Sequence, residues 1–166
     1  VTERQYNLLK EQEEVLSFPF EFFNKDWDLV LSVMKGRPFH IQGDLDLVAK
    51  NVESLGNLQS VSGFLDLYKA NIKTLGNLKS VGDRLDLRDS KIKSLGDLKM
   101  VGSYLELHRC EIDSLGDLES VDGHLDIRRT NIKSFGNLKW IGGSLFMGNT
   151  PLSKKYSEEQ IRQMVN

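Results

Sequence analysis

Apolar residues recur along the chain at a fixed interval of 20 positions, from about Ile41 to about Leu152. Such a period is typical of solenoids, in which stacked rungs bury what one rung cannot cover by itself. The unit V-x-G-x-L-D-L-x-x-x-x-I-x-S-L-G-N-L-x-S predicts five to six rungs. Its six apolar columns are Leu45, Leu65, Leu85, Leu105, Leu125 and Leu145; Leu47, Leu67, Leu87, Leu107, Ile127 and Met147; Val52, Ile72, Ile92, Ile112, Ile132 and Leu152; Leu55, Leu75, Leu95, Leu115 and Phe135; Leu58, Leu78, Leu98, Leu118 and Leu138; and Ile41, Val61, Val81, Val101, Val121 and Ile141.

The spacing of apolar residues changes within each rung. Leu65 and Leu67 are two positions apart, which predicts a short strand with one buried face. Ile72, Leu75 and Leu78 are three apart, which is the period of a 3₁₀ turn. The pattern therefore predicts an α/β solenoid with one parallel β-sheet and 3₁₀ or irregular returns.

Two sets of glycines mark each rung. The first set is followed by Asn or Asp, which predicts turns with a positive φ or a side chain bonded to its own backbone. Its members are Gly56, Gly76, Gly96, Gly116 and Gly136. The second set precedes the predicted strands and shifts by one position between rungs: Gly43, Gly63, Gly82, Gly102, Gly123, Gly142 and Gly143.

Segments outside the repeat predict helical caps over the two exposed ends. We expect an N-terminal cap over residues 1–39, repeats over 40–152 and a C-terminal helical cap over 153–166, all in one domain. The expected helices cover residues 2–17, a segment from Asp26 to Met34 capped by Asn24, and a segment opened by a capping box of Ser157 and Gln160. The cluster of Phe18, Phe20, Phe22, Phe23 and Trp27 is expected to close the first rung, with a binding surface as the alternative.

The composition of 39% hydrophobic and 28% charged residues is that of an ordinary soluble domain. The sequence shows neither an apolar run of the ~18 residues that span a membrane nor a secretory signal, which predicts a cytoplasmic protein without membrane contact. Cys110 is the only cysteine, so no internal disulfide and no thiolate zinc site can form. The net charge of −2 argues against general nucleic-acid binding, although a local patch stays open. No cofactor or metal is expected.

The unit L-x-x-V-x-x-x-L-x-L-x-x-x-x-I resembles the leucine-rich repeat, and L-G-N-L-x-S-V-x-G-x-L-D-L resembles the repeats of receptor L-domains. Residues 148–159 are similar to segments of repeat proteins from tailed phages and bacteria. The resemblance implies protein binding through the sheet face. Two features depart from it: the paired cysteines of extracellular L-domains are absent, and the column that holds Asn in leucine-rich repeats contains Lys50, Ala70, Ser90, Cys110, Thr130 and Thr150.

If the leucines of each strand point inward, the residues beside them form three outward columns. These are Asp44, Phe64, Arg84, Tyr104, His124 and Ser144; Asp46, Asp66, Asp86, Glu106, Asp126 and Phe146; and Val48, Tyr68, Arg88, His108, Arg128 and Gly148. The outer columns vary as recognition positions do, and Tyr and Arg are enriched at interface hot spots. We therefore predict a partner-binding site of Phe64, Tyr68, Arg84, Arg88, Tyr104, His108, His124 and Arg128. The alternative is a solvated sheet whose aromatic residues only pack along the columns.

The middle column is nearly uniform and acidic, with Asp46, Asp66, Asp86, Glu106 and Asp126. Carboxylates stacked ~4.8 Å apart repel one another, so pairing with the neighbouring arginines is the favoured interpretation. The open alternatives are a basic partner segment or a hard cation such as calcium.

Catalytic motifs are absent from the sequence, which contains no G-x-x-x-x-G-K-[ST], G-x-S-x-G or H-E-x-x-H. The sequence therefore predicts a non-catalytic intracellular protein-interaction module, phage-encoded if the similarity of residues 148–159 reflects its origin. The alternative is a structural component of a larger assembly that contacts its neighbours through the caps or the sheet edge.

Overall fold

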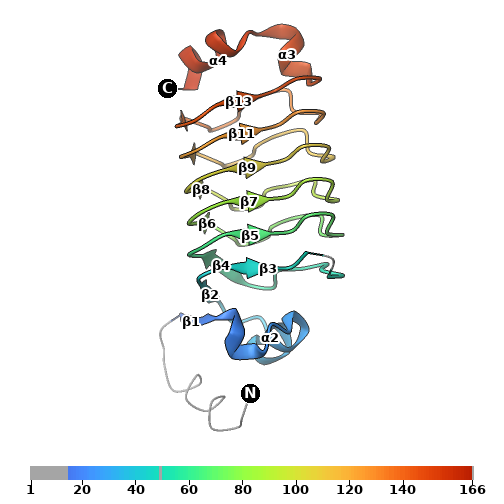
Figure 1. The fold of residues 1–166 in the computed structure, drawn as a ribbon, viewed down its shortest axis with the longest axis vertical. Helices are drawn as coiled ribbons and strands as arrows, with labels where there is room; N and C mark the ends of the chain where they lie inside the picture. The colour runs from blue at the N-terminus through green and yellow to red at the C-terminus, as the bar shows by residue number, and fades with distance from the viewer. Residues whose placement is uncertain (1–14, 49, 166) are drawn as a thin grey trace.

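The computed structural model of the protein describes residues 15–48 and 50–165. This part of the chain forms a parallel β-solenoid of about six turns, with successive turns about 20 residues apart. Figure 1 shows the rungs stacked along the long axis, with helix α2 (Trp27–Met34) at one end and helices α3 (Pro151–Lys155) and α4 (Glu158–Val165) at the other. Among the described residues, no helix is long and apolar enough to cross a membrane.

Each rung contributes one strand to each of two parallel sheets. The first sheet contains β1 (Leu16–Pro19), β2 (Phe39–Gln42), β4 (Leu58–Val61), β6 (Ser80–Val81), β8 (Met100–Val101), β10 (Ser120–Val121) and β12 (Trp140–Ile141). The second sheet contains β3 (Leu45–Asp46), β5 (Leu65–Asp66), β7 (Leu85–Asp86), β9 (Leu105–Glu106), β11 (Leu125–Asp126) and β13 (Leu145–Phe146). The second sheet is the one that the sequence predicts, and its register pairs each leucine with the leucine 20 positions later.

The prediction of a single sheet is wrong, because part of each return forms the first sheet, while the rest of the return is irregular, which is one of the two predicted alternatives. A single bond from the N–H of Leu78 to the carbonyl of Leu75, 3.3 Å long, closes a β-turn at Gly76, whose φ is +58°. The chain then extends, and its backbone bonds to the adjacent rung, as from Gly102 N–H to the Val81 carbonyl at 2.9 Å. Backbone groups are thus satisfied between rungs rather than within a 3₁₀ helix.

The positive φ predicted for the first glycine set is confirmed, with values between +57° and +59°. In the second set Gly43 also has a positive φ, of +76°, but the later members are glycine for a different reason. A Cβ on Gly102 would lie 2.1 Å from the carbonyl oxygen of Gly82, so glycine permits the close approach of neighbouring rungs at this corner.

The interior is filled by the six apolar columns, which are buried except for the partly buried Met147. In the column that would hold asparagine, Cys110 and Thr130 are buried and donate to turn carbonyls. The Cys110 thiol donates to Leu87 at 2.9 Å, and the Thr130 hydroxyl donates to Ile127 at 2.7 Å. These short side chains thus perform locally what an asparagine ladder would do.

The N-terminal cap combines β1, a 3₁₀ turn η1 (Phe20–Phe23) and α2 (Trp27–Met34). The helix expected over residues 2–17 lies mostly outside the described residues, and its predicted end is wrong because β1 instead extends the first sheet. Helix α2 is confirmed, but Asp26 is its N-cap, with its carboxylate accepting from Leu29 N–H at 3.0 Å. Asn24 instead ends η1 with a φ of 53°.

The aromatic cluster closes the first rung, as the sequence predicts. Its buried members are Phe18, Phe20, Phe23 and Trp27, and Phe22 packs against them. The Phe18 ring stacks on Phe39 of β2, with ring centroids 5.7 Å apart. Of this cluster, only the partly buried Phe22 keeps exposed surface for the alternative interpretation as a binding surface.

The C-terminal cap contains α3 (Pro151–Lys155), which the sequence analysis missed, and α4 (Glu158–Val165). The capping box of Ser157 and Gln160 is confirmed by reciprocal hydrogen bonds of 2.9 and 3.2 Å. Arg162 of α4 donates to the Gly143 carbonyl at 2.6 Å, which ties the helix to the last rung.

Candidate functional site

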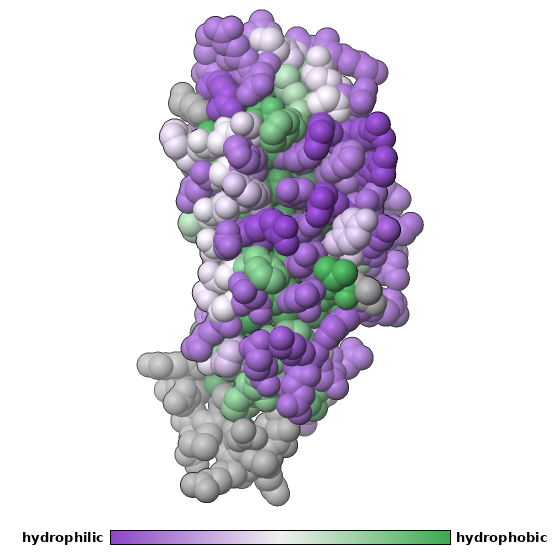
Figure 2. All heavy atoms as spheres, in the orientation of Figure 1, coloured by the Kyte–Doolittle hydropathy of each residue, from purple (hydrophilic) through white to green (hydrophobic). Residues whose placement is uncertain are grey.

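The outward surface of the second sheet, here called the strand face, carries all eight residues predicted to bind a partner. Tyr104 and Arg128 are exposed, and the other six are partly exposed: Phe64, Tyr68, Arg84, Arg88, His108 and His124. In Figure 2, which shows the same side as Figure 1, hydrophilic and apolar residues alternate over the second sheet. The strand face is therefore neither a uniformly polar nor a uniformly apolar surface.

Two buried carboxylates of the acidic column hold two arginines of this face. Asp86 accepts the backbone N–H of Arg88 at 3.0 Å, its Nε at 3.0 Å and its Nη2 at 2.5 Å. Asp126 and Arg128 repeat the arrangement at 3.0, 2.9 and 2.6 Å. The hydrogen bonds to Asp86 raise the pKa of Arg88 above its ordinary value. These contacts support the interpretation that arginines offset the repulsion within the column.

The other acidic residues are more open. Arg84 pairs with Asp66 at 3.2 Å, and Arg88 also approaches Glu106 at 3.2 Å. Burial raises the pKa of the Asp66 carboxyl, and the N–H of Tyr68 offsets part of this effect.

A calcium site gains no support from this arrangement. The carboxylates of Asp86 and Asp126 already accept from arginines, so both would have to exchange these partners for a metal ion. In the part of the chain that the structure describes, no three His, Cys, Asp or Glu side chains form a group suited to a metal.

Aromatic rings lie beside the arginines on three successive rungs. Tyr104 stacks on His124 with centroids 4.8 Å apart and an interplanar angle of 20°, and His124 meets Phe146 at 6.0 Å. The guanidinium of Arg128 lies over the Phe146 ring at 5.4 Å. Ser144 N–H donates to His124 Nδ1 at 2.6 Å, so the proton of the neutral imidazole lies on Nε2.

These groups surround a cleft of about 310 Å³ over β7, β9, β11 and β13. It is lined by Arg88, Tyr104, Leu105, Glu106, His124, Asp126, Arg128 and Phe146. The cleft thus brings together four of the eight predicted residues and two of the acidic column. His108 is not among its lining residues. Arg84 lies over the Phe64 ring at 5.8 Å, nearer the N-terminal cap, whereas the Tyr68 ring lies under Arg88 of the cleft at 5.5 Å.

The sequence analysis missed Phe146 as a site residue. It occupies the acidic column, which was interpreted as scaffold, yet its side chain is 43% exposed in the cleft. The signal was present in the sequence, since Phe146 alone breaks the run of acidic residues.

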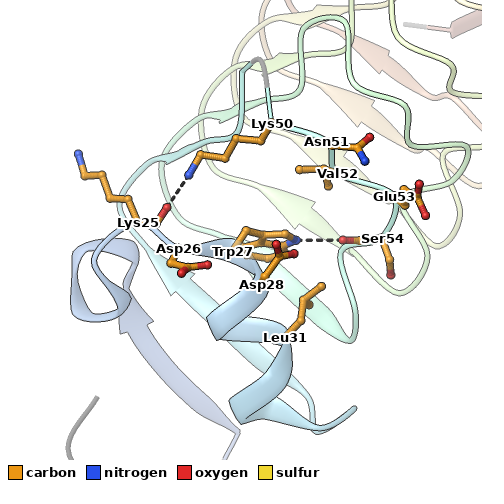
Figure 3. Close-up of a pocket in the computed structure, with 10 residues that line it drawn as sticks. All are labelled: Lys25, Asp26, Trp27, Asp28, Leu31, Lys50, Asn51, Val52, Glu53 and Ser54. Atoms are coloured by element: carbon orange, nitrogen blue, oxygen red, sulfur yellow. Dashed lines mark hydrogen bonds between the residues drawn. The ribbon is translucent and has the colours of Figure 1, made fainter.

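A second cavity, of about 710 Å³, lies between α2 and the first rung (Figure 3). Trp27 lies across this junction and donates from Nε1 to the Ser54 carbonyl at 3.0 Å, while Lys50 donates to the Lys25 carbonyl. Because Trp27 is only 4% exposed, its ring is occupied in joining the cap to the repeat. The cavity therefore lies at the junction that joins the N-terminal cap to the repeat.

The thiol of Cys110, the single cysteine, lies in the core of the solenoid. Cys110 is buried, and its hydrogen bonds go to Leu87 and Ser90. Burial raises the pKa of Cys110 to about 11, so the thiol is protonated at neutral pH.

The fold and the cleft define the class of this protein as a parallel β-solenoid with 20-residue rungs and an aromatic and arginine-rich face. Comparisons with protein families, curated proteins and solved structures find no match.

Proposed function

We propose that this β-solenoid is a non-catalytic protein-interaction module of the leucine-rich-repeat type, which binds a protein partner on its strand face. The observation that carries the proposal is the cleft. Tyr104 is 42% and Phe146 43% exposed there, beside the guanidinium groups of Arg88 and Arg128. Exposed aromatic rings and arginines supply the anchors of protein interfaces, and large apolar side chains left in water need another reason for their position.

The side chains of the cleft are also held in place before any partner binds. Arg88 and Arg128 are fixed by buried carboxylates, and His124 is fixed by Ser144 N–H. Ordering such side chains at an interface normally costs about 0.5–1.5 kcal/mol each, so this arrangement reduces the cost of association.

An open, shallow surface suits binding better than catalysis, which usually needs an enclosed pocket. Location in a reducing interior agrees with the single buried cysteine. Origin in a phage is supported by the similarity of residues 148–159 and by no structural observation.

A structural role in a larger assembly is the second candidate. Met164 on α4 is 57% exposed, and it borders a cleft between the C-terminal cap and the last rung. On the first sheet, Met100 and Trp140 are 44% and 48% exposed. Neighbouring subunits would cover these residues if the solenoid served as a building block.

A comparison of variants separates the two roles. Wild-type protein and a Tyr104→Ala/Phe146→Ala variant serve as bait in the lysate of the source cells, after circular dichroism shows that both fold. A Met100→Ala/Trp140→Ala variant removes similar apolar area from the other sheet and is the matched control. We expect a partner that wild type and control retain and the strand-face variant loses. Retention by the strand-face variant and loss by the control would instead favour assembly.

A further inference from the structure

The cleft presents hydrogen-bond donors to the outside and turns most of its acceptors inward. The side chain of Arg88 is 41% exposed, whereas that of its partner Asp86 is 1% exposed. For Arg128 and Asp126 the values are 49% and 8%. A guanidinium group has five N–H donors in one plane. Asp86 and Asp126 accept from Nε and Nη2, and Glu106 Oε2 lies 3.2 Å from Nε of Arg88, so the edge opposite Nε of each guanidinium is left for a ligand.

The two arginines have a defined separation. They occupy the same position in rungs that are two apart, and parallel strands lie about 4.8 Å from their neighbours, so the guanidinium groups are roughly 10 Å apart. His124 adds an Nε2–H donor between the Tyr104 and Phe146 rings, because its Nδ1 is already occupied. A ligand that matches this surface carries acceptors about 10 Å apart.

We propose that the cleft recognises an acidic segment of the protein partner, with carboxylates bound end-on by Arg88 and Arg128. This inference rests on the proposed function of the strand face. In a polyproline II segment, which has three residues per turn and a rise of about 3.1 Å, residues i and i+3 lie on the same side about 9 Å apart, so two acidic side chains at that spacing reach both guanidinium groups. Asp86 and Asp126 are positioning residues, which fix the plane of each guanidinium without touching the ligand.

Net charge attracts neither a carboxylate-bearing segment nor a nucleic-acid backbone to the cleft, so binding depends on the directed N–H donors. Attraction to a phosphate polymer depends on net positive charge, because it arises from the release of counterions. Here Asp86 and Asp126 neutralise Arg88 and Arg128, Glu106 adds a further negative charge, and the whole chain has a net charge of −2. Recognition in this cleft is therefore short-range and directional.

The test measures binding of fluorescein-labelled deca-glutamate by fluorescence anisotropy, beside labelled deca-lysine and a ten-nucleotide oligothymidine. We expect wild type to bind deca-glutamate most tightly. Arg88→Gln and Arg128→Gln should each weaken this binding about tenfold or more, the effect of losing a charge-assisted hydrogen bond. Arg88→Lys should weaken it as well, because lysine retains the charge but lacks the planar fork.

The matched control is Lys93→Gln/Lys133→Gln. These exposed lysines also lie two rungs apart, outside the cleft, and removing them changes the net charge by the same amount as removing both arginines. The control should bind deca-glutamate as wild type does. If Arg88→Gln does not fold, Asp86→Asn/Arg88→Gln removes both charges of the pair and should show the same loss.

Several results would overturn the inference. They are equal binding by the arginine variants, an equal loss in the lysine control, tighter binding of deca-lysine or oligothymidine, or no saturation by deca-glutamate at about 1 mM. Retention of the partner from the lysate distinguishes failure of this inference from failure of the proposed function. If Arg88→Gln/Arg128→Gln retains the partner that Tyr104→Ala/Phe146→Ala loses, the strand face binds its partner without acidic recognition. If both variants retain it, the proposed function fails as well.

Discussion

Replacing Asp86 by alanine tests whether the buried carboxylates organise the strand face. The comparison is Asp86→Ala against Asp46→Ala, because both carboxylates accept the backbone N–H two residues later at 3.0 Å. Asp86 is buried and also binds the Arg88 guanidinium, whereas Asp46 is exposed and has Val48 at the corresponding position. The difference between the two variants therefore reports the buried arginine pair.

The expected magnitude follows from these contacts. Breaking a fully buried ion pair costs about 3–5 kcal/mol, but Arg88 is 41% exposed and can turn into water, which lowers the estimate. We expect Asp86→Ala to lower the free energy of unfolding by about 2–3 kcal/mol. For Asp46→Ala, the loss of one exposed hydrogen bond predicts about 0.5–1 kcal/mol.

Urea unfolding followed by circular dichroism at pH 7 measures both changes. Asp126→Ala provides an internal check, since Asp126 makes the same contacts with Arg128 and should resemble Asp86→Ala. The reasoning is refuted if Asp86→Ala and Asp46→Ala agree within about 0.5 kcal/mol, because the arginine pairs would then contribute nothing measurable.

Two further predictions concern the rungs and their single thiol. Gly102→Ala should destabilise the protein by about 3 kcal/mol or more, since its Cβ would lie 2.1 Å from the backbone oxygen of Gly82. In Gly116→Ala the added Cβ meets no atom within 4 Å, so we expect a loss of only about 1–2 kcal/mol, the cost of the left-handed conformation for a residue other than glycine. Thermal unfolding measures both variants, and a loss for Gly116→Ala equal to or larger than that for Gly102→Ala would contradict the prediction. Cys110, with a pKa of about 11, should react with iodoacetamide at pH 8 at least about tenfold more slowly than in urea-unfolded protein, as mass spectrometry would show. Equal rates would mean that the rung opens readily.

The direction of the strand side chains could be predicted from the sequence, but their contacts with one another could not. The residues of the outer columns all lie on the strand face, because alternation along a strand fixes which side chains point out. Alternation does not say which of these side chains meet. Arg84 lies over Phe64, Arg88 lies over Tyr68, and Tyr104 stacks on His124. These contacts depend on which side chains face each other across neighbouring rungs.

The middle column, too, could be predicted only in part from the sequence. Its repetition in the sequence indicates scaffold, and the structure agrees for Asp86 and Asp126. Repetition did not predict the exposed position of Phe146. The last rung has no following strand to cover this position, and the Phe146 ring turns into the cleft.

The sequence by itself determined the period, the number of rungs, the inward leucines, the left-handed glycines and the helix opened by Ser157, since each depends on local pattern or local backbone geometry. Only the tertiary structure decided that part of each return becomes a second sheet. Apolar residues three positions apart fit either a 3₁₀ helix or a β-turn followed by a strand, and the two differ in where the backbone finds its hydrogen bonds. Stacking of the rungs favours the β-turn followed by a strand. A neighbouring rung supplies hydrogen-bond acceptors such as the Val81 carbonyl to extended residues, whose N–H groups a single rung would leave unpaired.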